Sequence, residues 1–307
     1  MKNASKLLLL FLLLLSKQVL SNKIDDLKTD QEVTEFVKTM NPQFAKDKYG
    51  RFAIKATDSI ARDLNCNGIF KSWNIKNWEK ADITNDGLTD LLFVAYWYDY
   101  ISYAFIDMGN NNFRLIRFSK NTFEPCELIK PIKIGSENYL KIFRKTAVPD
   151  TLNKEQLRYK DLMITDTLVF KFDSFTELSQ LKNQGNEIES IELKTDYCFG
   201  SCPVFELTLY KNGKANFIGK DYMQLKGKSS KRLPRKYFED VTDLATYIDV
   251  RNLKNNYAVT WTDDQTATLT VVFKDKSQKV IVDYGMQGTF GLNAIYGKLM
   301  KIALQWK

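Results

Sequence analysis

The chain has 307 residues, of which 44% are hydrophobic and 27% charged, a composition that excludes disordered and low-complexity proteins. The formal net charge is +8; the first 21 residues hold three lysines and no acid, so their removal leaves 42 cations against 37 anions, a net charge of +5. This mildly basic balance lacks the charge pattern of a nucleic-acid-binding protein, so no nucleic-acid partner is expected. The length suggests two domains.

The N-terminal segment 1–21 has the pattern of a secretory signal peptide. Lys2 and Lys6 precede nine apolar residues at 7–15, and Val19-Leu20-Ser21 allows cleavage after Ser21. The apolar run is too short to span a bilayer, although an uncleaved anchor or a buried helix is the alternative. We expect an exported chain, periplasmic or secreted, with no transmembrane segment after cleavage.

Residues 22–181 are expected to form the first of two α+β domains, each an antiparallel sheet with packed helices. A capping box formed by Thr29 and Glu32 precedes apolar residues at helical spacing and predicts a helix that ends at Asn41-Pro42. Aromatic and β-branched residues predict strands at 91–98, 103–107, 113–118, 139–143 and 167–172. The polar stretch 182–187 is the predicted linker.

Residues 188–307 are expected to form the second domain. Strands are predicted at 188–196 and 204–210, and Asn212-Gly213 predicts a hairpin turn of type I′. A helix beginning at Pro234, a hairpin across Lys274–Gln278 and a last helix with an apolar stripe follow. The order of strands, helix, strands and helix is typical of an antiparallel α+β domain.

The four cysteines and the absence of histidine constrain the chemistry. An even number of cysteines in an exported chain predicts disulfides; of three pairings, Cys66–Cys126 and Cys198–Cys202 are favoured because each lies within one expected domain. With no histidine, catalytic triads, Cys-His dyads and histidine-based metalloprotease sites are excluded. The same absence, and the C-x-x-x-C spacing, argue against a zinc site or a thiol oxidoreductase at Cys198 and Cys202.

The motif Cys198-Phe199-Gly200-Ser201-Cys202-Pro203 is followed by a strand, the Asn212-Gly213 hairpin and Asp264. In these features, over about residues 188–305, the chain resembles a family of exported bacterial proteins catalogued as a domain of unknown function. The N-terminal half resembles a companion region of the same proteins. The resemblance implies export and the domain layout, and it brings no activity and no catalytic residue.

The segment DITNDGLTD, 82–90, has the composition of a calcium loop. Carboxylates, a hydroxyl and a backbone carbonyl are available from Asp82, Thr84, Asp86, Leu88 and Asp90, and Gly87 permits a sharp bend. The spacing resembles the calcium loops of integrin-type FG-GAP repeats, which implies a structural Ca²⁺. It departs from the pattern at Thr84, it occurs once, and Phe93 stands where an EF-hand has Glu. A polar hairpin turn is the alternative interpretation.

Two further segments suggest ligand contacts. Residues 226–236 could bind an anionic partner, although a solvated loop before a helix is the simpler interpretation. The cations of this segment are Lys226, Lys228, Lys231, Arg232, Arg235 and Lys236. Trp261 with Asp263 and Asp264 offers carboxylates and an aromatic ring, as a glycosidase uses, or a turn.

Together these patterns favour a non-catalytic interaction module that binds a protein or a glycan. The alternative is a hydrolase that acts on envelope or extracellular polysaccharide through carboxylates. An open cleft with carboxylates about 5–10 Å apart would favour the hydrolase.

Overall fold

The computed structural model describes residues 22–47, 50–64, 66–119, 126–149, 159–179, 187–259 and 261–307. The expected signal peptide and all of the expected linker except Glu187 lie outside these residues. In the described part of the chain, no helix has the length and apolarity needed to cross a membrane.

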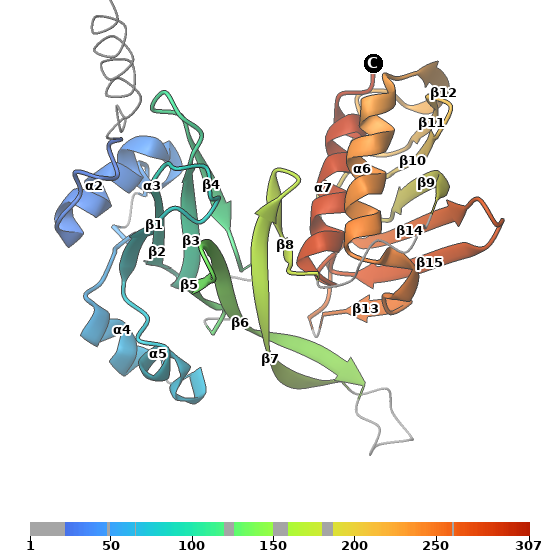
Figure 1. The fold of residues 1–307 in the computed structure, drawn as a ribbon. Helices are drawn as coiled ribbons and strands as arrows, with labels where there is room; N and C mark the ends of the chain where they lie inside the picture. The colour runs from blue at the N-terminus through green and yellow to red at the C-terminus, as the bar shows by residue number, and fades with distance from the viewer. Residues whose placement is uncertain are drawn as a thin grey trace, which may run out of the picture. The chain divides into compact units, whose positions relative to one another are not determined.

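The described residues form three sheets, mostly antiparallel, and a few helices (Figure 1). The chain divides into two compact units, Met1–Asn65 with Phe70–Pro125 and Cys66–Ile69 with Cys126–Lys307. The second unit therefore contains two of the three sheets, and its first sheet comes from residues that the sequence assigned to the N-terminal domain.

The first unit contains a four-stranded antiparallel sheet in the order β1-β2-β3-β4. Its strands are β1 (Trp78–Ala81), β2 (Asp90–Trp97), β3 (Asp99–Asp107) and β4 (Phe113–Arg117). Its helices are α2 (Asp30–Met40), α3 (Pro42–Ala45), α4 (Thr57–Asp63) and α5 (Ile69–Ser72). The short helix η1 (Cys66–Gly68) and the first residue of α5 are assigned to the second unit. The predicted capping box of α2 is present, with Thr29 and Glu32 bonded reciprocally. Phe36 of α2 lies edge-on to Phe105 of β3, with ring centroids 5.6 Å apart, so this helix closes the core over the sheet.

The first sheet of the second unit is an antiparallel meander in the order β5-β6-β7-β8. Its strands are β5 (Leu128–Ile134), β6 (Glu137–Pro149), β7 (Tyr159–Lys171) and β8 (Ser174–Glu177). The predicted strands at 139–143 and 167–172 fall in β6 and β7, while β5 and β8 were not predicted. β5 carries Pro131 between Lys130 and Lys133, which weakens its strand pattern, and β8 has only four residues.

The second sheet of this unit has seven strands in the order β12-β11-β10-β9-β14-β15-β13. The strands are β9 (Ile188–Thr195), β10 (Phe205–Tyr210), β11 (Lys214–Gly219), β12 (Gly227–Arg232), β13 (Asn256–Ala258), β14 (Thr266–Phe273) and β15 (Gln278–Tyr284). The helical segments are α6 (Arg235–Tyr247), η2 (Val250–Asn252) and α7 (Phe290–Leu304). All pairs are antiparallel except β13 with β15. Both long helices cover the same face of the sheet (Figure 1). The core lies between them and the sheet, because every second strand residue is buried there.

The β10–β11 hairpin forms at the predicted place but with another turn. Three residues separate the strands, and Gly213 alone among them has a positive φ, of 82°. Its N–H donates to the Tyr210 carbonyl, and Asn212 accepts from the N–H of Lys214. A type I′ turn would need positive φ at both central residues, so the prediction of that turn type was wrong. The glycine instead ends a three-residue loop, for which a type I turn followed by a left-handed residue is the usual geometry.

Candidate functional site

An exposed aromatic group stands at one end of the seven-stranded sheet. The loop from β9 to β10 contains Cys198 and Cys202, whose disulfide joins Cα atoms 5.9 Å apart. Phe199 between them is 89% exposed, which is far more than any other large hydrophobic side chain in the described residues. Tyr197 and Tyr222 are also exposed at this end. We call Tyr197, Phe199 and Tyr222 the aromatic tip.

The loop that carries Phe199 is held by backbone as well as by the disulfide. The N–H of Phe199 donates to the carbonyl of Asp263, 3.0 Å away in the loop before β14. The N–H of Gly200 donates to the Cys198 carbonyl at 3.0 Å, which closes a three-residue turn centred on Phe199. Phe199 therefore projects from a backbone that is fixed on two sides, and its exposure does not come from a loose loop.

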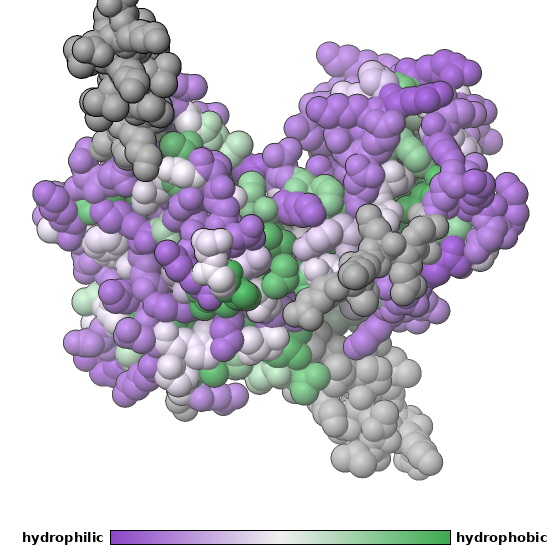
Figure 2. Space-filling model, viewed as in Figure 1, coloured by the Kyte–Doolittle hydropathy of each residue, from purple (hydrophilic) through white to green (hydrophobic). Residues whose placement is uncertain are grey.

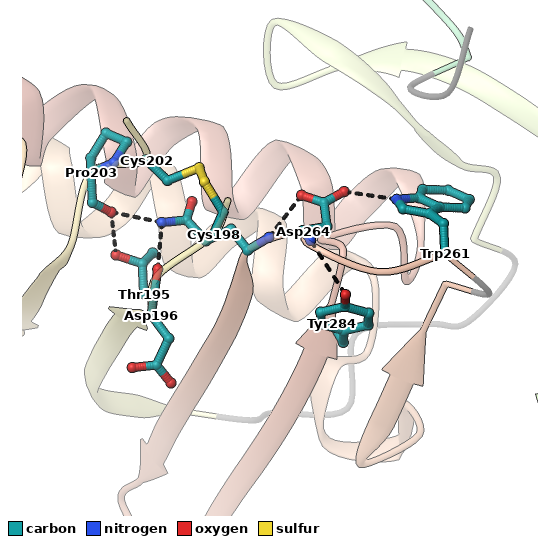
Figure 3. Close-up of a disulfide and its surroundings, with 9 residues drawn as sticks. Thr195, Asp196, Cys198, Cys202, Pro203, Trp261, Asp264 and Tyr284 are labelled. Carbon is teal, nitrogen blue, oxygen red and sulfur yellow. Dashed lines mark hydrogen bonds between the residues drawn. A yellow bond between two sulfur atoms is a disulfide. The ribbon is translucent and has the colours of Figure 1, made fainter. Parts of the chain in front are cut away.

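The buried side chain of Gln265 holds the two ends of this loop. Gln265 is 5% exposed, and its side-chain amide donates to the carbonyls of Asp196 and Pro203, each at 2.8 Å. Thr195 donates its hydroxyl to the same Pro203 carbonyl (Figure 3). These bonds satisfy the carbonyls on both sides of the disulfide, as buried polar groups require. The network fixes where the loop begins and ends.

Tyr197 is oriented by a neighbouring carboxylate. Its hydroxyl donates to Asp221, 2.7 Å away, and Lys226 pairs with the other oxygen of Asp221 at 3.2 Å. The Tyr197 hydroxyl and then Lys226 lower the pKa of the Asp221 carboxyl. The hydrogen bond to the Asp221 carboxylate in turn raises the pKa of Tyr197. The ring of Tyr197 is therefore held beside the segment that bears Tyr222.

The segment that suggested a glycosidase closes a turn in the structure. One oxygen of Asp264 accepts from the Trp261 indole at 3.1 Å, and the other accepts from the N–H of Gln265 at 2.8 Å (Figure 3). The backbone N–H of Asp264 donates to the hydroxyl of Tyr284. Asp264 therefore acts as a turn residue that also fixes Trp261.

The predicted calcium loop connects β1 to β2, and its carboxylates accept hydrogen bonds from the loop backbone. Asp82 accepts from the N–H groups of Asp86 and Gly87, at 3.1 and 2.9 Å, and Asp86 accepts from Leu88. The Thr84 hydroxyl lies 3.5 Å from Asp82. Gly87 has φ of 88°, as the sharp bend requires. The loop is thus wound around the side chain of its first carboxylate.

Asp90, the last residue of that loop and the first of β2, is fully buried. It accepts from the N–H groups of Ile83 and Asp107, each at 2.9 Å. Burial raises the pKa of Asp90 to about 7; the two backbone donors oppose this, and the charges of Asp86 and Asp82 add to it. Sequence reasoning missed the partner Asp107, itself buried, because it is distant in the chain.

The basic segment 226–236 is not a solvated loop. Residues Gly227–Arg232 form the edge strand β12, and α6 begins at Arg235. Lys226 is paired with Asp221, and Lys231 lies over the ring of Trp306 on the helix-covered side, 4.1 Å from its centroid. The six cations therefore do not converge on one site. The loop interpretation was wrong because the segment pairs residue by residue with β11.

The cysteine pairs are those expected. Cys66 and Cys126, 60 residues apart, form the other disulfide, with Cα atoms 5.3 Å apart. The exposure of Phe199 was not predicted from its motif. No local pattern could have shown it, because exposure depends on what the rest of the chain packs against the ring.

Comparison with known proteins gives one match. Residues 189–303 match the model of a family described as Domain of unknown function (DUF6438). No curated protein and no solved structure matches the chain. The matched range runs from β9 almost to the end of α7 and includes the aromatic tip. Residues 189–303 of this chain are therefore a DUF6438 domain.

Proposed function

We propose that the protein is an exported, non-catalytic interaction module that binds a partner protein through the aromatic tip. The observation that carries the proposal is the 89% exposure of Phe199 on a loop closed by the Cys198–Cys202 disulfide. Burying a phenylalanine side chain stabilises a complex by about 1.5–3 kcal/mol, so an isolated protein gains nothing from exposing it. Aromatic residues also dominate the binding energy of protein interfaces.

The construction of the loop favours recognition over chance exposure. A ring on a mobile loop loses conformational entropy when it is bound, whereas a ring on a fixed loop loses less. The disulfide, the Phe199–Asp263 hydrogen bond and the Gln265 network all fix this loop before any partner arrives. Tyr197 and Tyr222 add rings with polar ends beside it, as interfaces commonly use.

Export is the second part of the proposal. Two disulfides among four cysteines suit an oxidising compartment, and the segment 1–21 has the pattern of a signal peptide. We place the protein in the periplasm or outside the cell. A glycan is the other class of ligand considered for the same surface, because aromatic rings also stack on sugars.

Calcium binding by the loop 82–90 is the third part. Asp82, Asp86 and Asp90 lie near enough for their charges to disfavour ionised Asp90, and a divalent cation would relieve that repulsion. The ion would stabilise the first unit and take no part in a reaction. The alternative activity, a carboxylate-dependent hydrolase, draws no support from Asp264, since both its oxygens accept hydrogen bonds within its own turn.

The test places a photoreactive phenylalanine analogue at position 199 in cells that export the chain. Val280, 42% exposed on another strand of the same domain, receives the same analogue as the matched control. We expect one discrete protein adduct from position 199 and none from 280. The adduct partner, once purified, should bind the mature chain and bind Phe199→Ser at least about tenfold more weakly. Equal adducts from both positions, or equal affinity of the variant, would contradict the proposal.

A further inference from the structure

The outer edge of β12 is open. β12 stands at the end of the strand order, and within the described ranges no strand pairs with its outer side. Its register with β11 runs from Gly219–Gly227 to Lys214–Arg232 without a shift, so no bulge turns the edge away. Figure 1 shows β12 beyond β11 at the margin of the sheet, and hydrophilic residues dominate this region in Figure 2. Such an edge presents unpaired backbone N–H and C=O groups.

The hydrogen bonds at the ends of the hairpin identify these outward groups. The N–H of Leu233 donates inward to the Gly213 carbonyl, and strand residues alternate in direction. Ser229 and Lys231 therefore bond to β11, while Lys228, Ser230 and Arg232 direct their N–H and C=O groups outward. On the other side of β11, the N–H of Lys220 donates to Val204, which gives the same alternation.

The same three residues carry their side chains on the sheet face opposite the helices. Lys228 lies across from Ile218, Ser230 from Asn216 and Arg232 from Lys214. The facing residues on β11 alternate with buried Ala215 and Phe217, so all of these side chains project from the uncovered face.

Two cations, Lys214 and Arg232, thus stand directly opposite each other, an arrangement that destabilises a sheet. β11 and β12 contain no acidic residue to offset this repulsion.

These positive charges determine which kind of strand can pair with the outer edge of β12. A second copy of β12 would place Lys228 and Arg232 near the same cations of the first, so self-pairing is disfavoured. An acidic strand would instead meet a cation at both ends of the edge and the Ser230 hydroxyl between them.

We propose that the outer edge of β12 binds an extended acidic segment of another protein as an additional antiparallel or parallel strand. Acidic side chains at alternate positions would face Lys228 and Arg232, and main-chain hydrogen bonds to Lys228, Ser230 and Arg232 would give the affinity. This surface is separate from the aromatic tip, and the inference does not depend on the proposed function.

The test uses a synthetic probe, the dye-labelled peptide Thr-Glu-Thr-Glu-Thr-Glu-Thr with blocked ends, and the mature chain at low salt. Fluorescence anisotropy should show saturable binding that weakens as salt is added. A peptide with Gln in place of Glu should bind at least about tenfold more weakly, because it lacks the charges. A peptide with Pro in place of the central Glu and its two Thr neighbours should bind more weakly than one with Gln in place of the central Glu alone, because the two carry equal charge and proline cannot donate to β12 in either direction of pairing.

Ser230→Pro is the decisive variant, and Ser230→Thr is its matched control. Proline at this position removes one outward N–H and leaves the bonds to β11 intact, since proline is tolerated on an edge. We expect Ser230→Pro to weaken binding by at least about fivefold and Ser230→Thr to leave it unchanged. Circular dichroism must show that both variants keep the fold; if Ser230→Pro does not, the proline-containing peptide decides.

Two outcomes would overturn the inference. Equal binding of the Ser230→Pro and Ser230→Thr variants, or of the proline-containing peptide and its charge-matched Gln control, would mean that cations attract the probe without strand addition. Absence of saturable binding at low salt would mean that the basic edge only prevents aggregation. Phe199→Ser should leave probe binding unchanged, so failure of the aromatic tip and failure of this edge are distinguished.

Discussion

Glu177, the last residue of β8, accepts the N–H of Phe290 at the first turn of α7, with an Oε1–N distance of 2.6 Å. Its second oxygen accepts the N–H of Gly291 at 3.0 Å. A carboxylate at a helix N-terminus is stabilised by the helix dipole and by charge-assisted hydrogen bonds. This contact joins the β5–β8 sheet to the last helix of the chain, 113 residues further on.

Glu177→Gln should therefore destabilise the second unit. Gln can fill the same space, but it has one acceptor oxygen and no charge, so we expect a loss of about 1–2 kcal/mol in the free energy of unfolding. Urea unfolding followed by circular dichroism measures it. Glu137→Gln, at the exposed first residue of β6, is the matched control and should change little. Equal stability of the two variants would mean that the contact contributes nothing.

Truncation of the chain on either side of Glu177 tests the contact between Glu177 and α7 in a second way. A fragment of residues 126–307 keeps Glu177 and its helix, whereas a fragment of residues 188–307 leaves the N–H groups of Phe290 and Gly291 without their acceptor. The longer fragment, with Cys126 replaced by Ser in the absence of its partner, should melt at the higher temperature. A shorter fragment of equal stability would show that the DUF6438 domain is self-sufficient.

The loop 82–90 should bind calcium with one-to-one stoichiometry. Calorimetry of residues 22–307 would report the affinity, and a calcium concentration of 100 times Kd should add about 2.7 kcal/mol to the stability of the first unit. Asp86→Ala removes a proposed ligand near the surface and should abolish both effects; Asp26→Ala, outside the loop, should not. If millimolar calcium produces neither heat nor a melting shift, the loop is a polar turn.

Removal of the Cys198–Cys202 disulfide should loosen the aromatic tip more than it unfolds the domain. For a loop this short, chain entropy predicts a loss of about 2 kcal/mol when both cysteines become Ser. Hydrogen exchange of the Phe199 N–H, which donates to Asp263, should accelerate, whereas exchange of the core strand β14 should remain slow in comparison. Unchanged exchange at Phe199 would show that the backbone bonds suffice to hold the loop.

Glu187 should produce an acid-dependent loss of stability. Hydrogen bonds from Lys211 and then Lys274 lower the pKa of its carboxyl from 4.5 to about 2. Since the folded pKa is the lower one, the contribution is complete above about pH 4.5 and is lost as the pH falls toward 2. Both partners are exposed to solvent, so the effect is small and decreases with salt. NMR titration of the carboxyl carbon checks the pKa; a midpoint near 4.5 would contradict it.

Local patterns allowed much of the fold to be predicted. Alternation of apolar residues predicted β9, β10, β14 and β15, and the capping box predicted the start of α2. These features depend on neighbours within a few residues, which a sequence displays directly. β12 was not predicted because its sequence lacks the alternation of apolar and polar residues that marks a strand. It forms because its backbone pairs with β11.

The sequence by itself determined most of the strands and both long helices of residues 188–307 and the exclusion of histidine chemistry, and it favoured the pairing of Cys198 with Cys202. Only the tertiary structure decided that Phe199 has no core to enter, that Asp90 is buried beside Asp107, and that the edge of β12 is open. The physical reason is that exposure and burial depend on what the rest of the chain packs against a residue. Partners such as Glu177 and Phe290 are far apart in sequence, and no local pattern connects them.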